Sequence, residues 1–271
     1  MSAGKHFEPR RWLRLARAQG AEQARALGFF LLGVGVVHAL LAGAAIAASE
    51  GRALDVSAQS VVFTAGLLFS GYLYAHRVLA PLHQRETALV YLMRPASVLE
   101  KWLLLAVTLL VVYPLAYTLV FAVVYAPAGA LAYRVALADA LSRQPAGSLP
   151  HWSEYVLYLP WLSRALTPEA RVDGLWFIVY AAMQGYLATT LAYFGQRAAF
   201  KTLVLGLALF FITLLVLVLT LGDGPQVLLA WLDDDAHLTA AQTALTLVFW
   251  LGVPALLWLA ALAALRERDL R

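Results

Sequence analysis

The chain has 271 residues, of which 62% are hydrophobic and only 13% are charged. Soluble domains carry about 45–50% apolar and about 25% charged residues, so a water-soluble fold of this size could not cover so much apolar surface. Because there is no cysteine, disulfides, thiolate metal sites and cysteine nucleophiles are excluded, and the modest formal charge of +4 accompanies apolar segments rather than a nucleic-acid-binding motif.

The first 26 residues are basic and precede a long apolar run. In FEPRRWLRLARAQGAEQARALG, Arg10, Arg14 and Arg17 follow helical spacing, with Trp12 on another side. The pattern predicts an amphipathic helix over 1–26 that lies along the cytoplasmic membrane surface. Two interpretations remain open: the helix grips the bilayer or a partner, or it is a basic flank that only sets topology.

Six apolar segments are long enough to cross a bilayer, because about 20 helical residues span its hydrocarbon core. Backbone groups in lipid must be satisfied within helices or closed barrels, and these runs do not alternate as barrel strands do. We therefore expect an all-α, multi-pass membrane protein whose transmembrane domain covers 27–271. The predicted transmembrane helices are 27–48, 58–76, 102–126, 175–195, 203–221 and 243–265.

The distribution of lysine and arginine predicts the orientation. With the N-terminus in the cytoplasm, 15 of the 20 lysines and arginines lie in inner segments and 5 lie in outer segments. This bias follows the positive-inside rule and predicts that both termini are cytoplasmic. The abundance of alanine and leucine suits a bacterial inner membrane.

An outer-face segment is expected over 127–174, between the third and fourth spans. Its proline content excludes one long helix, and its piece HWSEYVLYLPWLSRAL is rich in the aromatic residues that favour the membrane–water boundary. We expect short helices packed against the outer face. Within the spans, Pro114 and Pro254 are expected to cause kinks, and Gly33, Gly35 and Gly43 to allow close helix packing. The prolines of the outer segment are Pro127, Pro145, Pro150, Pro160 and Pro168.

The second cytoplasmic loop, HRVLAPLHQRETALVYLMRPASVLEKWLLL, is longer and more regular than a simple connection requires. Apolar residues recur at helical intervals after Pro81, with two charged residues among them, which predicts a short amphipathic helix that ends at Pro95. Such a helix could transmit motion from a cytoplasmic partner, or it could rest on lipid headgroups. The residues of this predicted helix are Leu82, Arg85, Glu86, Leu89, Leu92 and Met93.

Directly after this helix, Ser97 and Glu100 form the pattern S-x-x-E at the entrance of the third span. This is a capping box, in which each side chain accepts a hydrogen bond from the other residue's backbone N–H. We expect it to set the angle at which the chain enters that span.

The stretch RETALVYLMRPASVLEKW resembles the coupling-helix region of type-2 ATP-binding-cassette (ABC) permeases. That family tends to show an R-E-x-G-T-L-like start, an apolar stretch, then P-x-S and a glutamate or lysine that enters the next span. Ala88 departs from the pattern, because glycine-threonine is commoner there. Six spans, cytoplasmic termini and an N-terminal amphipathic helix also suit the family, over nearly the whole chain. The matching residues are Arg85-Glu86-Thr87, Leu89, Leu92, Pro95, Ser97, Glu100 and Lys101.

The resemblance implies a permease subunit of an exporter, assembled as a homodimer or heterodimer over two nucleotide-binding ATPase subunits. Residues Leu82 to Met93 would dock in the partner's groove, with Leu89 and Leu92 as apolar anchors and Arg85 and Glu86 in polar contacts. The chain has no G-x-x-x-x-G-K-[ST], so ATP and Mg would bind the partner, and this chain would be neither an enzyme nor a cofactor-binding protein. The cargo could be a lipid, a peptide or a hydrophobic compound.

An alternative function uses the same loop helix in a different way. A non-transporting membrane scaffold or sensor subunit would need it only to recruit a cytoplasmic partner. The sequence pattern of the loop suits both functions.

Polar residues within the predicted spans are few, and they are candidates because their burial in lipid is costly. His38 is a proton relay, a substrate contact or a neutral imidazole hydrogen-bonded to a neighbouring helix, whereas Gln184 suits a contact between helices. The spans contain no pair of carboxylates, and His76 and His83 lack a third ligand, so no metal site and no catalytic residue are predicted.

Overall fold

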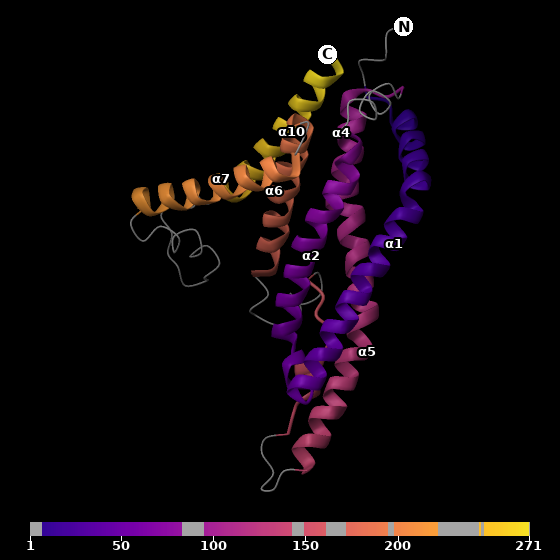
Figure 1. Ribbon diagram of the computed structural model, residues 1–271, viewed down its shortest axis with the longest axis vertical. Coiled ribbons are helices and arrows are strands. Elements are labelled where there is room, and N and C mark those ends of the chain that lie inside the picture. The colour runs from indigo at the N-terminus through magenta and orange to yellow at the C-terminus, as the bar shows by residue number, and fades with distance from the viewer. Residues whose placement is uncertain are drawn as a thin grey trace. The chain divides into compact units, whose positions relative to one another are not determined.

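The computed structural model describes residues 7–82, 95–142, 149–160, 172–194, 198–221, 244 and 247–270. All regular secondary structure in these ranges is helical, as the sequence predicts (Figure 1). The chain divides into two units. Unit 1 comprises Met1–Trp12, Tyr72–Ala106 and Arg171–Arg271, and unit 2 comprises Leu13–Gly71 and Val107–Ala170.

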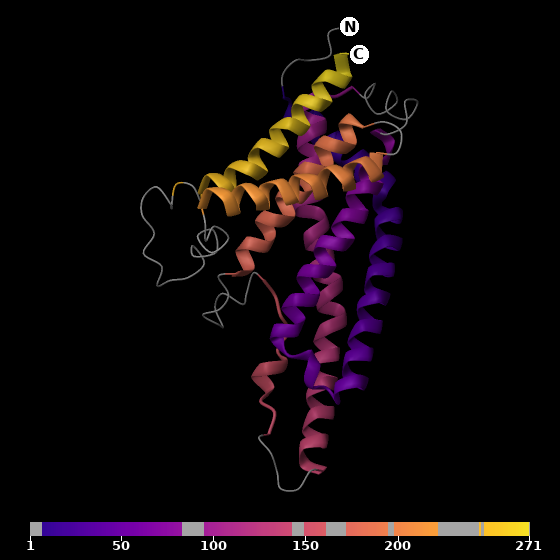
Figure 2. The ribbon, with the colours of Figure 1, turned by 60° about the vertical axis from the view of Figure 1, so that its left-hand side comes forward.

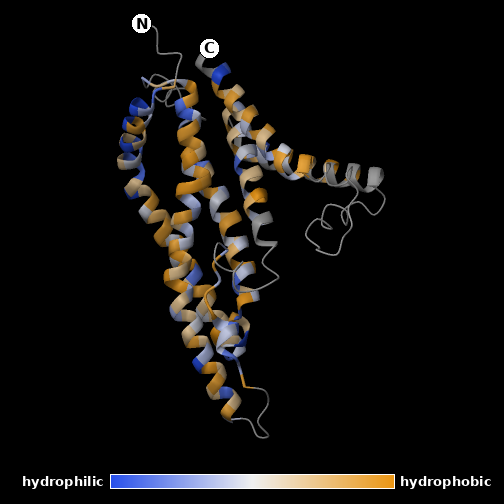
Figure 3. Cartoon of the chain, turned by 180° about the vertical axis from the view of Figure 1, so that it is seen from behind, coloured by the Kyte–Doolittle hydropathy of each residue, from blue (hydrophilic) through white to orange (hydrophobic). Residues whose placement is uncertain are grey.

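Four helical stretches are long and apolar enough to cross a membrane: Pro9–Ser49, Val56–Leu79, Val98–Ser142 and Val248–Glu267. Figure 3 shows hydrophobic residues along most of their length. Large apolar side chains on them are exposed, which lipid favours and water does not; Phe29 is 65% exposed and Leu119 is 67% exposed. These helices indicate a membrane-embedded protein.

Two of the six predicted spans are not among these four. Helix α6 (Val172–Tyr193) covers most of the predicted range 175–195, and α7 (Ala198–Leu221) covers the predicted range 203–221. However, α6 carries several polar residues along its length. Helix α7 has no charged residue after Lys201, but only its part Phe200–Leu209 is identified as an apolar helix within the described residues. The crossing of the membrane by these two helices therefore stays a prediction.

Helix α1 (Pro9–Ser49) is one continuous helix of 41 residues, about 60 Å long. The predicted boundary between an interfacial helix over 1–26 and a span from 27 is not a break in the structure. Alanine, leucine and arginine are strong helix formers, and Pro9 occupies the first turn, where its missing N–H costs nothing. An interfacial helix that turns sharply into a span is therefore not confirmed.

Both prolines that were expected to kink the spans directly follow a wide, π-helical turn. Helix α4 (Val98–Val107) leads into the turn Thr108–Val112, where the Tyr113 N–H donates to the Thr108 carbonyl, and α5 (Tyr113–Ser142) then contains Pro114. A second such turn, Val248–Gly252, precedes Pro254 in α10 (Val253–Leu270). A proline has no N–H to offer the preceding turn, and a wide turn is a recognised site of helix distortion.

Pro127 does not end its helix, so the predicted start of the outer-face segment at 127 is not a helix boundary. Helix α5 continues through Pro127 to Ser142. A proline inside a helix costs about 3 kcal/mol, but it lies on the exposed side, while Tyr125, Gly129 and Ala132 are buried on the other. Packing of the buried face outweighs the local preference.

The core of unit 2 is an aromatic column on α5. Its rings recur at every fourth position, and each is at most 1% exposed. Phe63 of α2 (Val56–Leu79) packs edge-to-face against two of these rings. The members of the aromatic column are Tyr113, Tyr117, Phe121 and Tyr125.

The glycines of α1 do not all serve close packing in the described part of the chain. A Cβ on Gly35 would lie 3.2 Å from Val120, so this glycine does allow a close approach. A Cβ on Gly33 or Gly43 would meet no heavy atom within 4 Å.

In unit 1, two tryptophans join α4, α6 and α10. The Trp102 Nε1–H donates to the Trp258 carbonyl at 2.9 Å, and the Trp258 Nε1–H donates to the Ala181 carbonyl at 3.0 Å. Gly185 provides the room, because a Cβ there would lie 2.9 Å from the Trp258 ring.

Candidate functional site

The candidate site is the corner at which the second cytoplasmic loop enters α4. Of the predicted docking residues, Leu82 ends the short 3-10 helix Ala80–Leu82. The other five, Arg85, Glu86, Leu89, Leu92 and Met93, lie outside the described residues. The described residues downstream of this gap begin at Pro95, so the part of the predicted site that the structure describes there is the corner that leads into α4.

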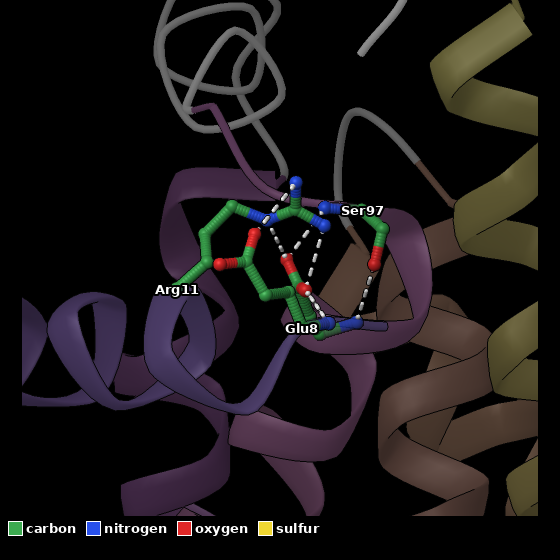
Figure 4. Close-up of polar contacts among 4 residues, drawn as sticks. Glu8, Arg11 and Ser97 are labelled. Atoms are coloured by element: carbon green, nitrogen blue, oxygen red, sulfur yellow. Dashed lines mark hydrogen bonds and ion pairs between the residues drawn. The ribbon is translucent and has the colours of Figure 1, made fainter. Parts of the chain in front are cut away.

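Ser97 and Glu100 make both hydrogen bonds of a capping box. The Ser97 N–H donates to Glu100 Oε2 at 2.9 Å, and the Glu100 N–H donates to Ser97 Oγ at 3.3 Å (Figure 4). These bonds satisfy donors that the first turn of a helix leaves without partners.

The carboxylate of Glu100 also binds the start of α1, a contact that no sequence pattern predicts. Arg11 donates from Nε to Oε2 and from a terminal nitrogen to Oε1, both at 2.8 Å (Figure 4). The Glu8 N–H donates to Oε1, also at 2.8 Å. We call Glu8, Arg11, Ser97 and Glu100 the Glu100 clamp. It joins residues that lie 89 or more positions apart in the chain.

The Glu100 side chain is completely buried, whereas that of Arg11 is 23% exposed. Burial raises the pKa of Glu100, but hydrogen bonds from Arg11 and from the backbone N–H groups of Glu8 and Ser97 outweigh it and lower the pKa to about 2. The hydrogen bond to Glu100 raises the pKa of Arg11 above its already high value. Both groups therefore remain charged at neutral pH.

The geometry of the clamp suits a structural joint rather than catalysis. Each oxygen of Glu100 already accepts two hydrogen bonds, so the carboxylate has little capacity left for a substrate or a metal ion. No group of three or more metal-ligating side chains occurs in the described ranges. A paired, bidentate arginine–carboxylate contact fixes direction as well as distance.

The two polar residues singled out within the spans differ in their surroundings. His38 Nε2 lies 3.0 Å from the Tyr117 hydroxyl of α5, whose oxygen is also 2.9 Å from the Phe63 carbonyl that it donates to. Gln184 of α6 is completely buried, and neither atom of its amide has a hydrogen-bond partner within the described ranges.

Sequence patterns do not reveal Glu8 and Arg11 as partners of Glu100. The available signal is indirect. An acidic residue at the entrance of an apolar span needs a cation when it is buried, and the richest source of cations is the basic stretch at the start of α1. Several arginines in that stretch were equal candidates.

Comparison with protein-family models, with curated proteins and with solved structures finds no match to this chain.

Proposed function

We propose that this chain is the permease subunit of an ATP-binding-cassette exporter in a bacterial inner membrane. In this proposal the chain has six spans and cytoplasmic termini, and it assembles as a homodimer or heterodimer of permeases. A separate nucleotide-binding subunit binds ATP and Mg. The proposal rests on the loop that resembles a coupling helix and, above all, on the Glu100 clamp at its end.

The clamp supports the proposal because coupling requires a stiff path from the loop into the membrane. A force on segment 83–94 reaches the corner at Pro95–Ser97 directly through the backbone. At that corner, Ser97 is bonded to the first turn of α4, and Glu100 is bonded to the first turn of α1. A displacement of the loop would thus move the start of α4 and the first turn of α1 together.

The charge of the clamp adds to its stiffness. Removal of one partner from a buried ion pair leaves an uncompensated charge, which is strongly destabilising. The corner therefore resists separation of α1 from α4, and a docked ATPase would shift the joint as a unit rather than break it. The substrate class remains a lipid, a peptide or a hydrophobic compound.

The test uses the full chain co-expressed with its candidate ATPase subunit and reconstituted in proteoliposomes. Leu89→Asp should abolish docking and uncouple ATP hydrolysis from transport, because it places a charge on an apolar anchor. Gln84→Asp, on the same loop but outside the apolar set, is the matched control and should remain coupled. Normal coupling in Leu89→Asp would contradict the proposal, and a Leu89-dependent partner without ATPase activity would favour the scaffold or sensor function.

A further inference from the structure

Residues 149–160 form a strap in unit 2 that returns along α5. The strap comprises the 3-10 helix η4 (Trp152–Tyr155) and an extended stretch that follows it (Figure 2). Trp152 packs edge-to-face against Tyr133 with ring centroids 5.1 Å apart, and Tyr158 packs against Phe63 at 5.7 Å. Trp152 is 51% exposed, whereas Tyr158 is only 4% exposed, so the strap passes from the surface into the core.

The strap ends level with the outer ends of the predicted spans 58–76 and 102–126. Phe63, which contacts Tyr158, also contacts Phe121 at 5.0 Å. Phe121 precedes Tyr133 by 12 positions, which is about 18 Å along a helix, and it falls within the predicted span 102–126. The strap therefore begins beyond the predicted span and ends level with the outer turns of that span.

Non-helical backbone at membrane depth persists only where the protein satisfies its polar groups. Here the completely buried side chain of Gln59 satisfies two such groups of the strap. Its amide nitrogen donates to the carbonyls of Leu54 at 3.1 Å and Val156 at 3.4 Å, and its oxygen accepts from the Tyr158 N–H at 3.0 Å. Gln59 thus binds the carbonyl of one strap residue and the N–H of the next but one.

A glycine in α5 lets the strap approach closely. A Cβ on Gly129 would lie 2.7 Å from the Tyr155 carbonyl oxygen, which is closer than side chains tolerate. Tyr155 itself is 5% exposed and packs against Tyr133. Gly129 and Gln59 contact successive parts of the strap backbone, and both contacts require it to be in place.

We propose that the strap is a plug that closes this end of unit 2 to water and to cargo, and that Gln59 is the latch that holds it. All bonds of the latch are between neutral groups, so water can replace them when the strap withdraws. Withdrawal would uncover Phe63 and, behind it, the aromatic column with the His38–Tyr117 pair. In the exporter proposed above, withdrawal of the strap is the step that opens the path of the cargo to the outer face. Only this role in transport depends on the proposed function.

Thiol labelling tests the plug directly, because the natural chain contains no cysteine. Val156→Cys, a near-isosteric change, reports on the strap through its rate of reaction with a membrane-impermeant maleimide in native membranes. Gly129→Ala should push out the Tyr155 carbonyl and raise that rate at least tenfold. Gly43→Ala is the matched control, because its new methyl group meets no atom within 4 Å, and it should leave the rate unchanged.

A second variant, Gln59→Leu, removes the latch without adding bulk to α5 and should raise the rate similarly. Ser70→Cys, at a position 6% exposed beside Tyr113, controls for general unfolding and should stay unlabelled in both variants. An unchanged Val156→Cys rate in Gly129→Ala, labelling of Ser70→Cys in both variants, or a parent that labels as fast as Trp152→Cys would each overturn the plug. Labelling requires no ATPase, so this test can support the plug even if the exporter proposal is contradicted. Equally, a negative labelling result leaves the exporter proposal untouched.

Discussion

The Glu100 clamp in unit 1 and the Gln59 latch in unit 2 solve the same problem with different chemistry. Each is a completely buried polar side chain that binds backbone groups of a segment outside the regular helices. Glu100 is charged and accepts hydrogen bonds from an arginine and from backbone N–H groups. Gln59 is neutral, and its side-chain amide makes three hydrogen bonds. A buried charge cannot lose its partner cheaply, but a neutral amide can exchange its bonds for water. The difference separates a permanent joint from a releasable one.

The largest effect is expected when the charge of the clamp is removed. Glu100→Gln keeps the shape of the side chain but loses the charge-assisted bonds to Arg11, so the free energy of unfolding should fall by about 1–3 kcal/mol. Tryptophan fluorescence during thermal unfolding in detergent measures it. The control is Glu154→Gln, at an exposed position, which should change stability by less than about 0.5 kcal/mol. Equal effects of the two substitutions would show that Glu100 is not a joint.

Acid should remove the same contribution from the wild-type protein. The pKa of Glu100 is lowered from 4.5 to about 2, so its stabilising contribution is complete above about pH 4.5 and is lost as the pH falls toward 2. The stability difference between wild type and Glu100→Gln should therefore shrink across this window.

The Gln59 latch is neutral, so its contribution to stability should not depend on pH as that of Glu100 does. The stability difference between wild type and Gln59→Leu should not change over the same pH range, because an amide does not titrate. A difference that stays constant for Glu100→Gln would show that its carboxylate is not held ionised by the clamp.

A smaller effect on global stability is expected from Gln59→Leu. The strap groups that lose the latch can reach water by local opening, so the free energy of unfolding should fall by only about 1 kcal/mol. Hydrogen exchange followed by mass spectrometry should show much faster exchange of the Tyr158 amide, while amides of the aromatic column in α5 keep their protection. Unchanged exchange at Tyr158 would mean that Gln59 does not hold the strap.

The smallest effect is expected at Gly43, and its sign is opposite. Gly43→Ala adds a methyl group in open space within α1 and reduces the freedom of the unfolded chain, so it should stabilise by about 0.5 kcal/mol. Gly129→Ala should instead destabilise the strap, as judged by the same unfolding and exchange measurements. Similar changes in stability at both glycines would contradict the claim that Gly129 is needed for the close approach of the strap to α5.

Local sequence rules predicted the membrane character and the helical class well. Long apolar runs predict spans because hydrocarbon admits no unsatisfied backbone, and four such helices are present. Helix α5 nevertheless continues through Pro127, because the opposite face of α5 is buried and its packing outweighs a local cost. The interfacial helix predicted over 1–26 is not confirmed as a separate element, because the helix-forming stretch continues through residue 26.

What the sequence determined by itself was local: apolar stretches of spanning length, and a serine and a glutamate three positions apart that cap a helix. The tertiary structure alone decided that Arg11 is the partner of Glu100 and that Gln59 holds the strap. Those contacts join residues between 89 and 99 positions apart. Helical periodicity relates residues three or four positions apart, and it carries no information on which distant donor a buried acceptor will meet.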